Sequence, residues 1–280
     1  PVPVVSVEKD TWVPGGAANV AANLAGLGAQ TSLLGAFNDD PDGQRLRQLL
    51  HTRNIELLDA GCRPDCTTIV KARIMVQRQQ LCRLDREMQP SAYQLPDQWG
   101  AVLTQPWDAI VLSDYAKGVV TQPLLDRVRA HQTPPKPLLA LDPKPKHTLD
   151  LRGMDLMTPN RAEARQLAEM ADEPHGPLDD DRLCAEIYQR YAPKYLVITL
   201  GPEGMLLCEE GRVLGRKPTV VREVFDVSGA GDTVVAVLTA SLAAGASLQD
   251  AAELANRAAG IVVGHVGTVP VTMAELAATA

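Results

Sequence analysis

The chain has 280 residues, 45% of them hydrophobic, so it can form one large α/β domain or two small ones and is too apolar for a disordered protein. Its formal net charge of -7 argues against general binding to nucleic acids or membrane surfaces, so local basic clusters have to hold any anionic ligand. There is no apolar run of about 18 residues and no signal-peptide pattern, and we expect a cytoplasmic protein without a membrane span. Because the first residue is Pro1 rather than Met, we expect a preceding segment to be missing.

The cysteines favour a reduced protein. There are five of them, an odd number, and none forms a CxxC pair. Such spacing fits ordinary thiols better than a disulfide scaffold. A metal cluster of Cys62, Cys66 and His51 is the weaker interpretation, because zinc frameworks space their ligands differently.

Two stretches in the first third of the chain predict a small sheet beside the main body. The opening PVPVVSV is one candidate strand, and residues 67–87 are typical of two strands with a turn near Arg78–Gln80. We therefore expect lid strands at about 1–8 and 66–86.

Between the two lid stretches, PGGAANVAANLAGLG at 14–28 predicts an alanine-rich helix with a glycine pair at its start. Gly15 and Gly16 permit close approach of the backbone to a ligand, and the amide of Asn19, one turn in, can bond a hydroxyl-rich ligand. A helix that merely packs tightly through small residues is the alternative.

The predicted lid is locally basic. Between Arg63 and Glu87 there are six Arg or Lys residues and three Asp or Glu residues. Alternation in IVKARIMV puts Lys71 and Arg73 on one face of their strand. The patch is either a solvated edge that avoids aggregation through charge or a basic lid over an anionic substrate.

From residue 107 onward, short apolar runs alternate with helical patterns. Such alternation predicts βαβ units around a mostly parallel sheet that is covered on both faces. No linker is long enough to divide the chain, so we expect one domain over 1–280. The expected strands are 108–114, 138–143, 155–160 and 195–200, and the expected helices are 121–131, 161–170, 183–191 and 234–244.

The stretch TPNRAE places Asn160 and Glu163 where a strand ends and a helix begins. The pair is explained adequately as a capping box. The carboxyl edge of a parallel sheet is also where such folds bind ligands, and these oxygens could hold a hydrated Mg²⁺ on ATP phosphates. TLGPEGM, residues 199–205, is a similar glycine loop at a strand end.

DVSGAGDT at 226–233 introduces a helix with glycines that are poor helix formers. They leave the first N–H groups of the helix uncovered, which makes an anion site, and we expect Asp226 and Ser228 to shape the turn. Asp232 beside that site can accept the proton of an attacking alcohol, as an Asp does in other kinases. An Asp that only complements the helix dipole is the alternative. Neither the P-loop nor the G-x-G-x-x-G fingerprint is present, so a nucleotide has to be bound in another way.

Together, PGGAANVA and DVSGAGDT, in this order, resemble the two signatures of the ribokinase-like (PfkB) carbohydrate kinases, and the similarity covers essentially the whole chain. RQQLCRLD, LSDYAKG, LLALDPK and TPNRAE are similar to the members of that family that phosphorylate D-glycero-β-D-manno-heptose 7-phosphate. The resemblance implies a three-layer α/β/α sandwich with a mostly parallel central sheet and a small β lid. It implies transfer of a phosphoryl group from Mg·ATP to the anomeric 1-hydroxyl, in ADP-heptose and lipopolysaccharide synthesis. It also implies a homodimer formed through the lid and allows a monovalent cation at the 226–231 turn.

The resemblance assigns roles to individual residues. The catalytic set is Asp232 as base with Gly229, Ala230 and Gly231 as the anion hole. The ATP-binding set is Asn160, Glu163, Thr199, Gly201, Gly204, Asn256 and Gly260, with Glu163 on Mg²⁺ through water. The substrate-binding set is Gly15, Gly16, Asn19, Lys71, Arg73, Arg83 and Asp114.

The chain departs from the family pattern in several places. Val227 replaces a common Thr, and His265 stands in GHVGT where a Lys is usual, which puts a nucleotide contact there in doubt. The family's first strand has no counterpart before Pro1, and no nucleotidyltransferase region follows Ala280, so the chain resembles a kinase half alone. The alternatives are another sugar or nucleoside kinase, such as a ribokinase or fructokinase, and a non-catalytic sugar-binding protein on the same fold.

Overall fold

The computed structural model describes residues 4–76, 79–131, 134–146, 148–170, 179–220, 226–265 and 267–278. Six strands form the central sheet in the order β10-β9-β8-β7-β6-β5. Strands β5 to β8 are parallel, and β9 and β10 are each antiparallel to the strand before. The six are β5 (Ala109–Ser113), β6 (Leu138–Asp142), β7 (Leu156–Met157), β8 (Tyr195–Thr199), β9 (Met205–Glu209) and β10 (Arg212–Lys217).

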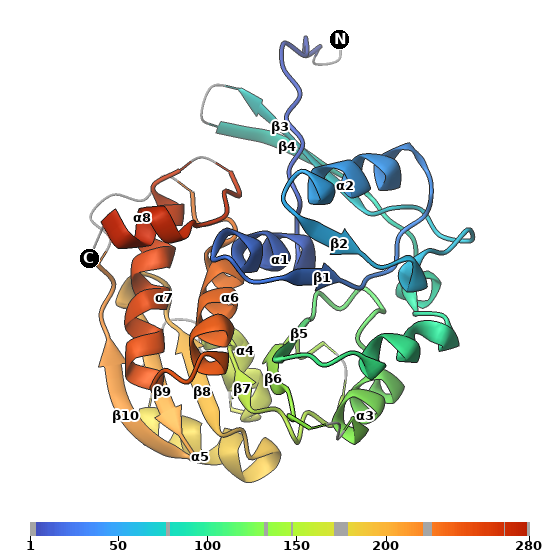
Figure 1. The fold of residues 1–280 in the computed structure, drawn as a ribbon. Helices are drawn as coiled ribbons and strands as arrows, with labels where there is room; N and C mark the ends of the chain where they lie inside the picture. The colour runs from blue at the N-terminus through green and yellow to red at the C-terminus, as the bar shows by residue number, and fades with distance from the viewer. Residues whose placement is uncertain are drawn as a thin grey trace.

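Helices cover both faces of this sheet (Figure 1), as the alternation in the sequence predicts. One layer is built from α1, α6, α7 and α8, and the other from α3, α4 and α5. The helices are α1 (Ala17–Gly26), α2 (Pro41–His51), α3 (Gln122–Ala130), α4 (Arg161–Leu167), α5 (Asp180–Tyr191), α6 (Ala230–Ala243), α7 (Leu248–Val263) and α8 (Met273–Ala278). The arrangement confirms the predicted three-layer sandwich with its mostly parallel sheet.

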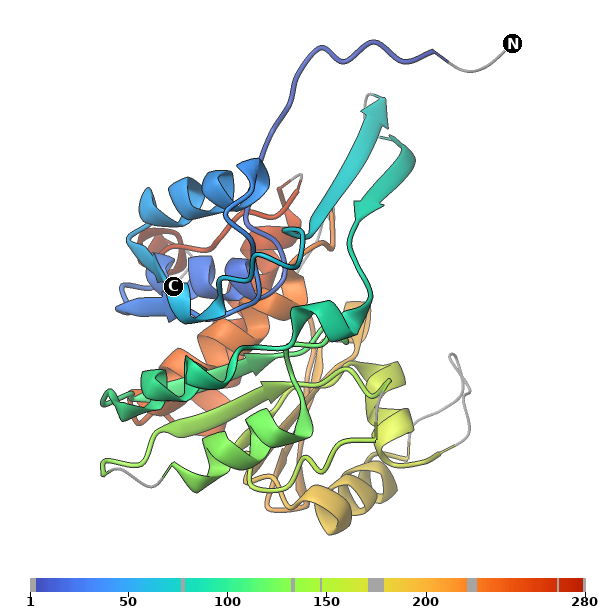
Figure 2. The same cartoon turned by 90° about the vertical axis from the view of Figure 1, so that its right-hand side faces the viewer.

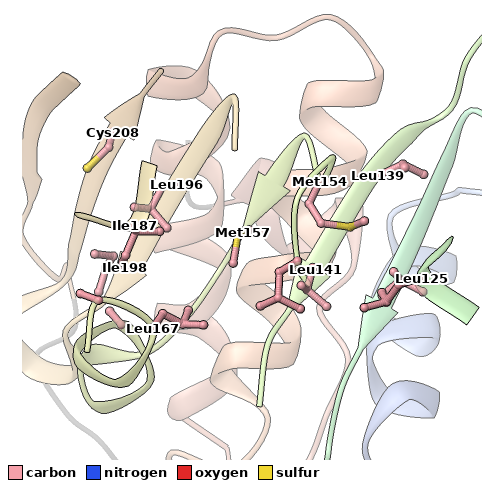
Figure 3. Packing of buried hydrophobic residues seen from close by; sticks show 14 of the residues in the cluster. Leu125, Leu139, Leu141, Met154, Met157, Leu167, Ile187, Leu196, Ile198 and Cys208 are labelled. Atoms are coloured by element: carbon pink, nitrogen blue, oxygen red, sulfur yellow. The ribbon is translucent and has the colours of Figure 1, made fainter. Parts of the chain in front are cut away.

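The sheet contributes side chains alternately to two cores, because successive residues of a strand point to opposite faces. Leu139 and Leu141 of β6 pack with Ile187 of α5 in one core (Figure 3), whereas Ala140, between them, packs in the other core with Val237 of α6. Burial on both faces explains why these strands are continuous apolar runs in the sequence.

A disulfide joins Cys184 of α5 to Cys208 of β9, and both residues are fully buried in the same core. The expectation that these thiols are unpaired is therefore wrong. Their separation of 24 residues matches no spacing pattern, and only the packing of the α3–α4–α5 layer on the sheet brings them together. Cys62, Cys66 and Cys82 are free.

A smaller part of the chain forms two two-stranded sheets outside the central sheet. Strands β1 (Thr31–Leu33) and β2 (Ile55–Leu57) pair in parallel and pack with α1 and α2. The hairpin of β3 (Val70–Val76) and β4 (Gln79–Arg86) projects away from the body (Figure 2), inside the expected lid range of 66–86.

The expected lid strand at 1–8 is wrong over its described part. Residues 4–8 are extended but form no strand, and residues 1–3 lie outside the described residues. A strand is stable only when it is paired, and β3 and β4 pair only with each other in the described part of the chain. Among the described helices, none has both the length and the apolar character that crossing a membrane requires.

Candidate active site

The glycine turn before α6 is shaped by a close approach between two distant segments. Gly229 is the N-cap of α6 and has φ 83°, in the left-handed region that favours glycine. A Cβ at this position would lie 2.7 Å from the side-chain nitrogen of Asn19. The N–H of Ala230 donates a 3.3 Å hydrogen bond to the carbonyl of Val227, so this group of the expected anion hole already has an acceptor. Gly231 lies at the exposed start of the helix, where a Cβ would meet nothing within 4 Å outside its own helix and chain neighbours.

Asp232 lies in the first turn of α6, and each of its carboxylate oxygens accepts one hydrogen bond. The Asn19 amide donates to Oδ2 at 2.8 Å, and the Tyr115 hydroxyl donates to Oδ1 at 2.5 Å. Burial raises the pKa of Asp232 above its ordinary value, and the hydrogen bonds from Tyr115 and Asn19 offset this only in part. The carboxylate is therefore fixed in orientation and more basic than an exposed Asp, as a general base requires.

Asp226 stabilises the turn before α6 through hydrogen bonds to backbone N–H groups. Its carboxylate accepts hydrogen bonds from the N–H groups of Ser228 at 2.9 Å and Gly267 at 3.0 Å. Burial alone would raise the pKa of Asp226, but these hydrogen bonds and the charge of Arg73 lower it overall. Asp226 is thus ionised and holds the loop shape, as the sequence suggested.

The glycine pair before α1 is close to Tyr115, which contacts Asp232. Gly15 is exposed, and Gly16 is the N-cap of α1. A Cβ on Gly16 would lie 3.4 Å from the ring of Tyr115, so the tyrosine covers the start of this helix. Gly16, Asn19 and Asp232 are thereby brought together around Tyr115.

Asn160 and Glu163 form the capping box at the start of α4. The Asn160 side chain accepts from the Glu163 N–H at 3.0 Å, and the Asn160 N–H donates to Glu163 Oε2 at 2.9 Å. The other oxygen, Oε1, accepts from Lys144 at 2.6 Å. Thr199 lies alongside Asn160 in an isolated β-bridge, so the two expected ATP-side residues share one edge of the sheet.

Asp142 is a carboxylate of this region that sequence reasoning missed. It ends β6, and Thr158 donates a 3.0 Å hydrogen bond to it. Burial and the nearby charge of Glu163 raise the pKa of Asp142 to about 7, and the charge of Asp232 adds to the effect. Its position at the carboxyl end of a buried strand was the available signal, and only the fold shows that both Asp232 and Glu163 are close enough to act on it.

The remaining expected ATP-side residues lie on two further segments. Gly201 and Gly204 bound a short 3₁₀ turn between β8 and β9, and the Gly204 N–H donates to the Gly201 carbonyl at 3.0 Å. Asn256 is buried in α7, and its amide donates to the carbonyl of Pro218 at 2.7 Å. Gly260 is one turn further along α7.

The substrate-side residues of the hairpin are exposed. Lys71 is opposite Asp85, and Arg73 is opposite Arg83, so these side chains share one face, as predicted for Lys71 and Arg73. Ion pairs neutralise part of the face, because Asp85 pairs with Lys71 at 2.9 Å and with Arg83 at 2.8 Å. Arg78, which the sequence also places in the lid, lies outside the described residues.

Asp114, which is expected to bind the substrate, lies in the loop after β5. Its side chain is only 7% exposed, and Oδ1 accepts a 2.8 Å hydrogen bond from the N–H of Ala116. This hydrogen bond fixes the shape of the loop. Asp114 therefore supports the position of Tyr115, which sequence reasoning did not single out.

Comparisons with known proteins show the family and the fold of the chain. The model of the family described as pfkB family carbohydrate kinase matches residues 1–274. The Bifunctional protein HldE of Methylobacillus flagellatus is 41% identical and that of Nitrosococcus oceani 40% identical, each over 99% of this chain. The chain spans 57% and 58% of the length of these two relatives. The structure of Arabidopsis thaliana ribokinase complexed with ribose and ATP is similar with a TM-score of 0.78 and 19% identity, over 98% of this chain and 90% of that chain, which shows a common fold.

Proposed function

Because the chain belongs to the pfkB family of carbohydrate kinases, we propose that it phosphorylates the anomeric 1-hydroxyl of D-glycero-β-D-manno-heptose 7-phosphate with Mg·ATP. The product would be the 1,7-bisphosphate, a precursor of ADP-heptose for lipopolysaccharide. The observation that carries the proposal is Asp232, held by Asn19 and Tyr115 at the start of α6. The choice of sugar is supported by the heptose-kinase-like stretches of the sequence and by full-chain similarity to two proteins named Bifunctional protein HldE.

Asp232 acts as the general base in this proposal. It takes the proton of the sugar hydroxyl as the hydroxyl oxygen bonds to the γ-phosphorus and the bond from that phosphorus to the ADP oxygen breaks. The products are the sugar phosphate, ADP and a proton that Asp232 returns to solvent. The first N–H groups of α6, at Gly231 in particular, stabilise the charge on the transferring group.

The residues on the nucleotide side suit a hard divalent cation. Glu163 and Asp142 are carboxylates close enough for the charge of Glu163 to raise the pKa of Asp142, and a cation between them and the phosphates would relieve that repulsion. No group of three or more acidic, His or Cys side chains that could hold a metal occurs among the described residues. Mg²⁺ would therefore take most of its ligands from ATP phosphates and water, with Glu163 acting through water. When bound, the ion neutralises phosphate charge.

The hairpin supports a phosphorylated sugar. Its exposed face carries Lys71, Arg73 and Arg83, and Arg73 is close enough to Asp226 for its charge to lower the pKa of that carboxyl. The basic face is therefore near the turn that introduces α6. A phosphate monoester brings roughly -1.5 to -2 charges and suits such cations better than a neutral sugar does.

The same hairpin supports association of two copies. Leu81 is 56% exposed and Leu84 is 61% exposed on β4, on a two-stranded sheet whose edges are otherwise unpaired in the described structure. We place the enzyme as a homodimer through this lid, in the cytoplasm, where ATP and sugar phosphates are made. Analytical ultracentrifugation would detect the dimer, and a Leu84→Lys variant should then sediment as a monomer.

The deciding experiment measures ADP release with heptose 7-phosphate, unphosphorylated heptose, ribose, fructose, fructose 6-phosphate and adenosine. Heptose 7-phosphate should give the highest kcat/KM, and Asp232→Asn should slow the release at least about 100-fold. Preference for another sugar would identify the enzyme as a different member of the family. Sugar binding without any ADP release would support the non-catalytic alternative.

A further inference from the structure

Tyr115 contacts the proposed base and covers the start of α1. Its hydroxyl donates to Asp232 Oδ1 at 2.5 Å, and its ring lies over Gly16. The residue is 40% exposed, so the open part of the ring is accessible to a ligand on the sugar side. One side chain therefore touches both the proposed base and the segment expected to bind the sugar.

Two contacts fix the backbone of the loop that carries Tyr115. The Asp114 carboxylate accepts from the N–H of Ala116, whose φ of 53° lies in the left-handed region, which is unfavourable for a residue with a Cβ. Gly118 has φ 94°, and a Cβ there would lie 1.8 Å from the carbonyl oxygen of Pro90. Backbone strain held by such contacts clusters at functional sites, and here its result is the placement of the Tyr115 hydroxyl.

Tyr115 can serve only as a hydrogen-bond donor to Asp232. Burial and the negative charge of Asp232 raise the pKa of the phenol far above its ordinary value, so it keeps its proton at every working pH. Asp142 is the other titratable group near enough to raise the pKa of Tyr115, and it too carries negative charge when ionised. A donor that cannot lose its proton stabilises the ionised form of the carboxylate it faces.

We propose that Tyr115 is the positioning residue of Asp232, which fixes the orientation of the carboxylate and favours its ionised state so that it can accept the sugar proton. The proposal rests on the phosphoryl-transfer function proposed above. Asn19 holds the opposite oxygen, so the two donors together leave the carboxylate one orientation. Loss of the Tyr115 hydroxyl alone should therefore affect the chemical step and its pH dependence rather than the binding of ATP.

The test uses Tyr115→Phe, which keeps the ring over Gly16 and removes only the donor. We expect kcat to fall about 10- to 100-fold, the equivalent of one hydrogen bond to a charged group. The KM for ATP should stay within about two-fold, since an interaction made at the reacting group acts on kcat. The acidic limb of the pH–rate profile should move to higher pH, because the Asp232 carboxylate loses a hydrogen bond that favours ionisation.

Tyr93→Phe is the matched control. The Tyr93 hydroxyl accepts from the N–H of Met88 at 2.8 Å, and the residue is buried. Only burial, Tyr115 and Asn19 shift the pKa of Asp232, so loss of the Tyr93 hydroxyl should lower the melting temperature without moving the pH profile. The double variant Tyr115→Phe with Asp232→Asn should be no slower than Asp232→Asn alone, since Tyr115 acts through Asp232.

A titration of the carboxyl carbon of Asp232 by nuclear magnetic resonance keeps this inference separate from the proposed function. Tyr115→Phe should raise the pKa of Asp232 even if the wild-type protein phosphorylates none of the sugars offered. An unchanged titration together with an unchanged pH profile would overturn the positioning role. A faster Tyr115→Phe enzyme would also overturn it, because the hydroxyl would then obstruct the acceptor.

Discussion

Asn19 and Asp232 lie 213 positions apart in the chain, and the Asn19 amide donates a 2.8 Å hydrogen bond to the Asp232 carboxylate. The carbonyl of Asn19 in turn accepts from the amide of Asn23, whose oxygen accepts from the Thr233 hydroxyl and the Val271 N–H. Asn19 and Asn23 are at most 2% exposed, so these hydrogen bonds form a buried network. Satisfied buried networks fix one arrangement, and here that arrangement ties α1, α6 and the segment before α8 into one unit.

The first prediction concerns the proposed base. Asp232→Asn should lower kcat by about 10²–10⁴, the usual contribution of a general base. ATP binding should stay the same or tighten, because a negative charge near the phosphates is removed. Steady-state kinetics and calorimetric ATP binding measure the two effects. If the variant kept more than about a tenth of the wild-type kcat, Asp232 would only complement the helix dipole.

The second prediction separates the two glycines of the α6 turn. Gly229→Ala should lower stability by about 1 kcal/mol or more, because Ala is strained at φ 83° and its Cβ would displace the Asn19 amide. Gly231→Ala is the control, since a Cβ there meets nothing within 4 Å and Ala favours a helix over Gly by about 1 kcal/mol. Thermal melts of both variants measure this difference. If Gly229→Ala and Gly231→Ala had equal melting temperatures, the turn before α6 could accommodate a Cβ at position 229 without loss of stability.

The third prediction tests whether Glu163 does more than cap α4. Glu163→Gln keeps an oxygen for the Asn160 N–H but loses the charge that Lys144 and a cation would meet. The Mg²⁺ concentration for half-maximal activity should rise more than the melting temperature falls. Ser247→Ala, which removes the N-cap of α7, is the control and should cost about 0.5–2 kcal/mol of stability with no change in the Mg²⁺ dependence. If Glu163→Gln also lost stability without a change in the Mg²⁺ dependence, Glu163 would serve only to cap α4.

The sequence was sufficient for the parallel strands β5 to β8 and for the two helices that begin at glycine-rich turns, α1 and α6. Buried parallel strands leave continuous apolar runs, and two glycine-rich helix starts are recognisable wherever they occur. It was insufficient for Tyr115 and Asp142, whose importance comes from distances across the fold and not from any local pattern. The Cys184–Cys208 disulfide was missed for the same reason.

The lid shows a different kind of failure. PVPVVSV at the N-terminus predicts a strand, but an apolar stretch does not specify the strand with which it would pair. A strand also needs a partner, and residues 4–8 pair with neither β3 nor β4, which pair only with each other in the described structure.

The fourth prediction follows from the raised pKa of Asp142, about 7 against an ordinary value of 3.8. Between these pH values the folded protein holds a proton that the unfolded chain has lost, so stability falls as the pH rises from about 4 to about 7. Asp142→Asn cannot titrate and keeps an acceptor for Thr158. Its stability relative to wild type should therefore increase by at least about 1 kcal/mol across that range, because each pKa unit corresponds to about 1.4 kcal/mol. Urea unfolding in EDTA at pH 5 and pH 7.5 measures this, and a constant difference would contradict it.

The last prediction concerns the basic face of the hairpin. Lys71→Ala and Arg73→Ala should weaken binding of the sugar phosphate far more than binding of ATP, by about 1.5–3 kcal/mol for each charged hydrogen bond lost. The effect should be larger at low salt, because exposed charges are screened as ionic strength rises. Arg73→Ala is the more informative of the two variants, because Lys71 already forms ion pairs with Asp85 and Glu87.

Arg86→Ala is the matched control for this prediction. Arg86 belongs to the same hairpin but is opposite Val70, on the other face, and pairs with Asp42. It removes one positive charge without touching the Lys71–Arg73 face, so it tests whether net charge alone matters. If all three variants weakened sugar-phosphate binding equally, the hairpin would attract the substrate only through its overall charge. If none did, the face would be a solvated edge whose charges prevent aggregation, and a neutral sugar would become the better substrate candidate.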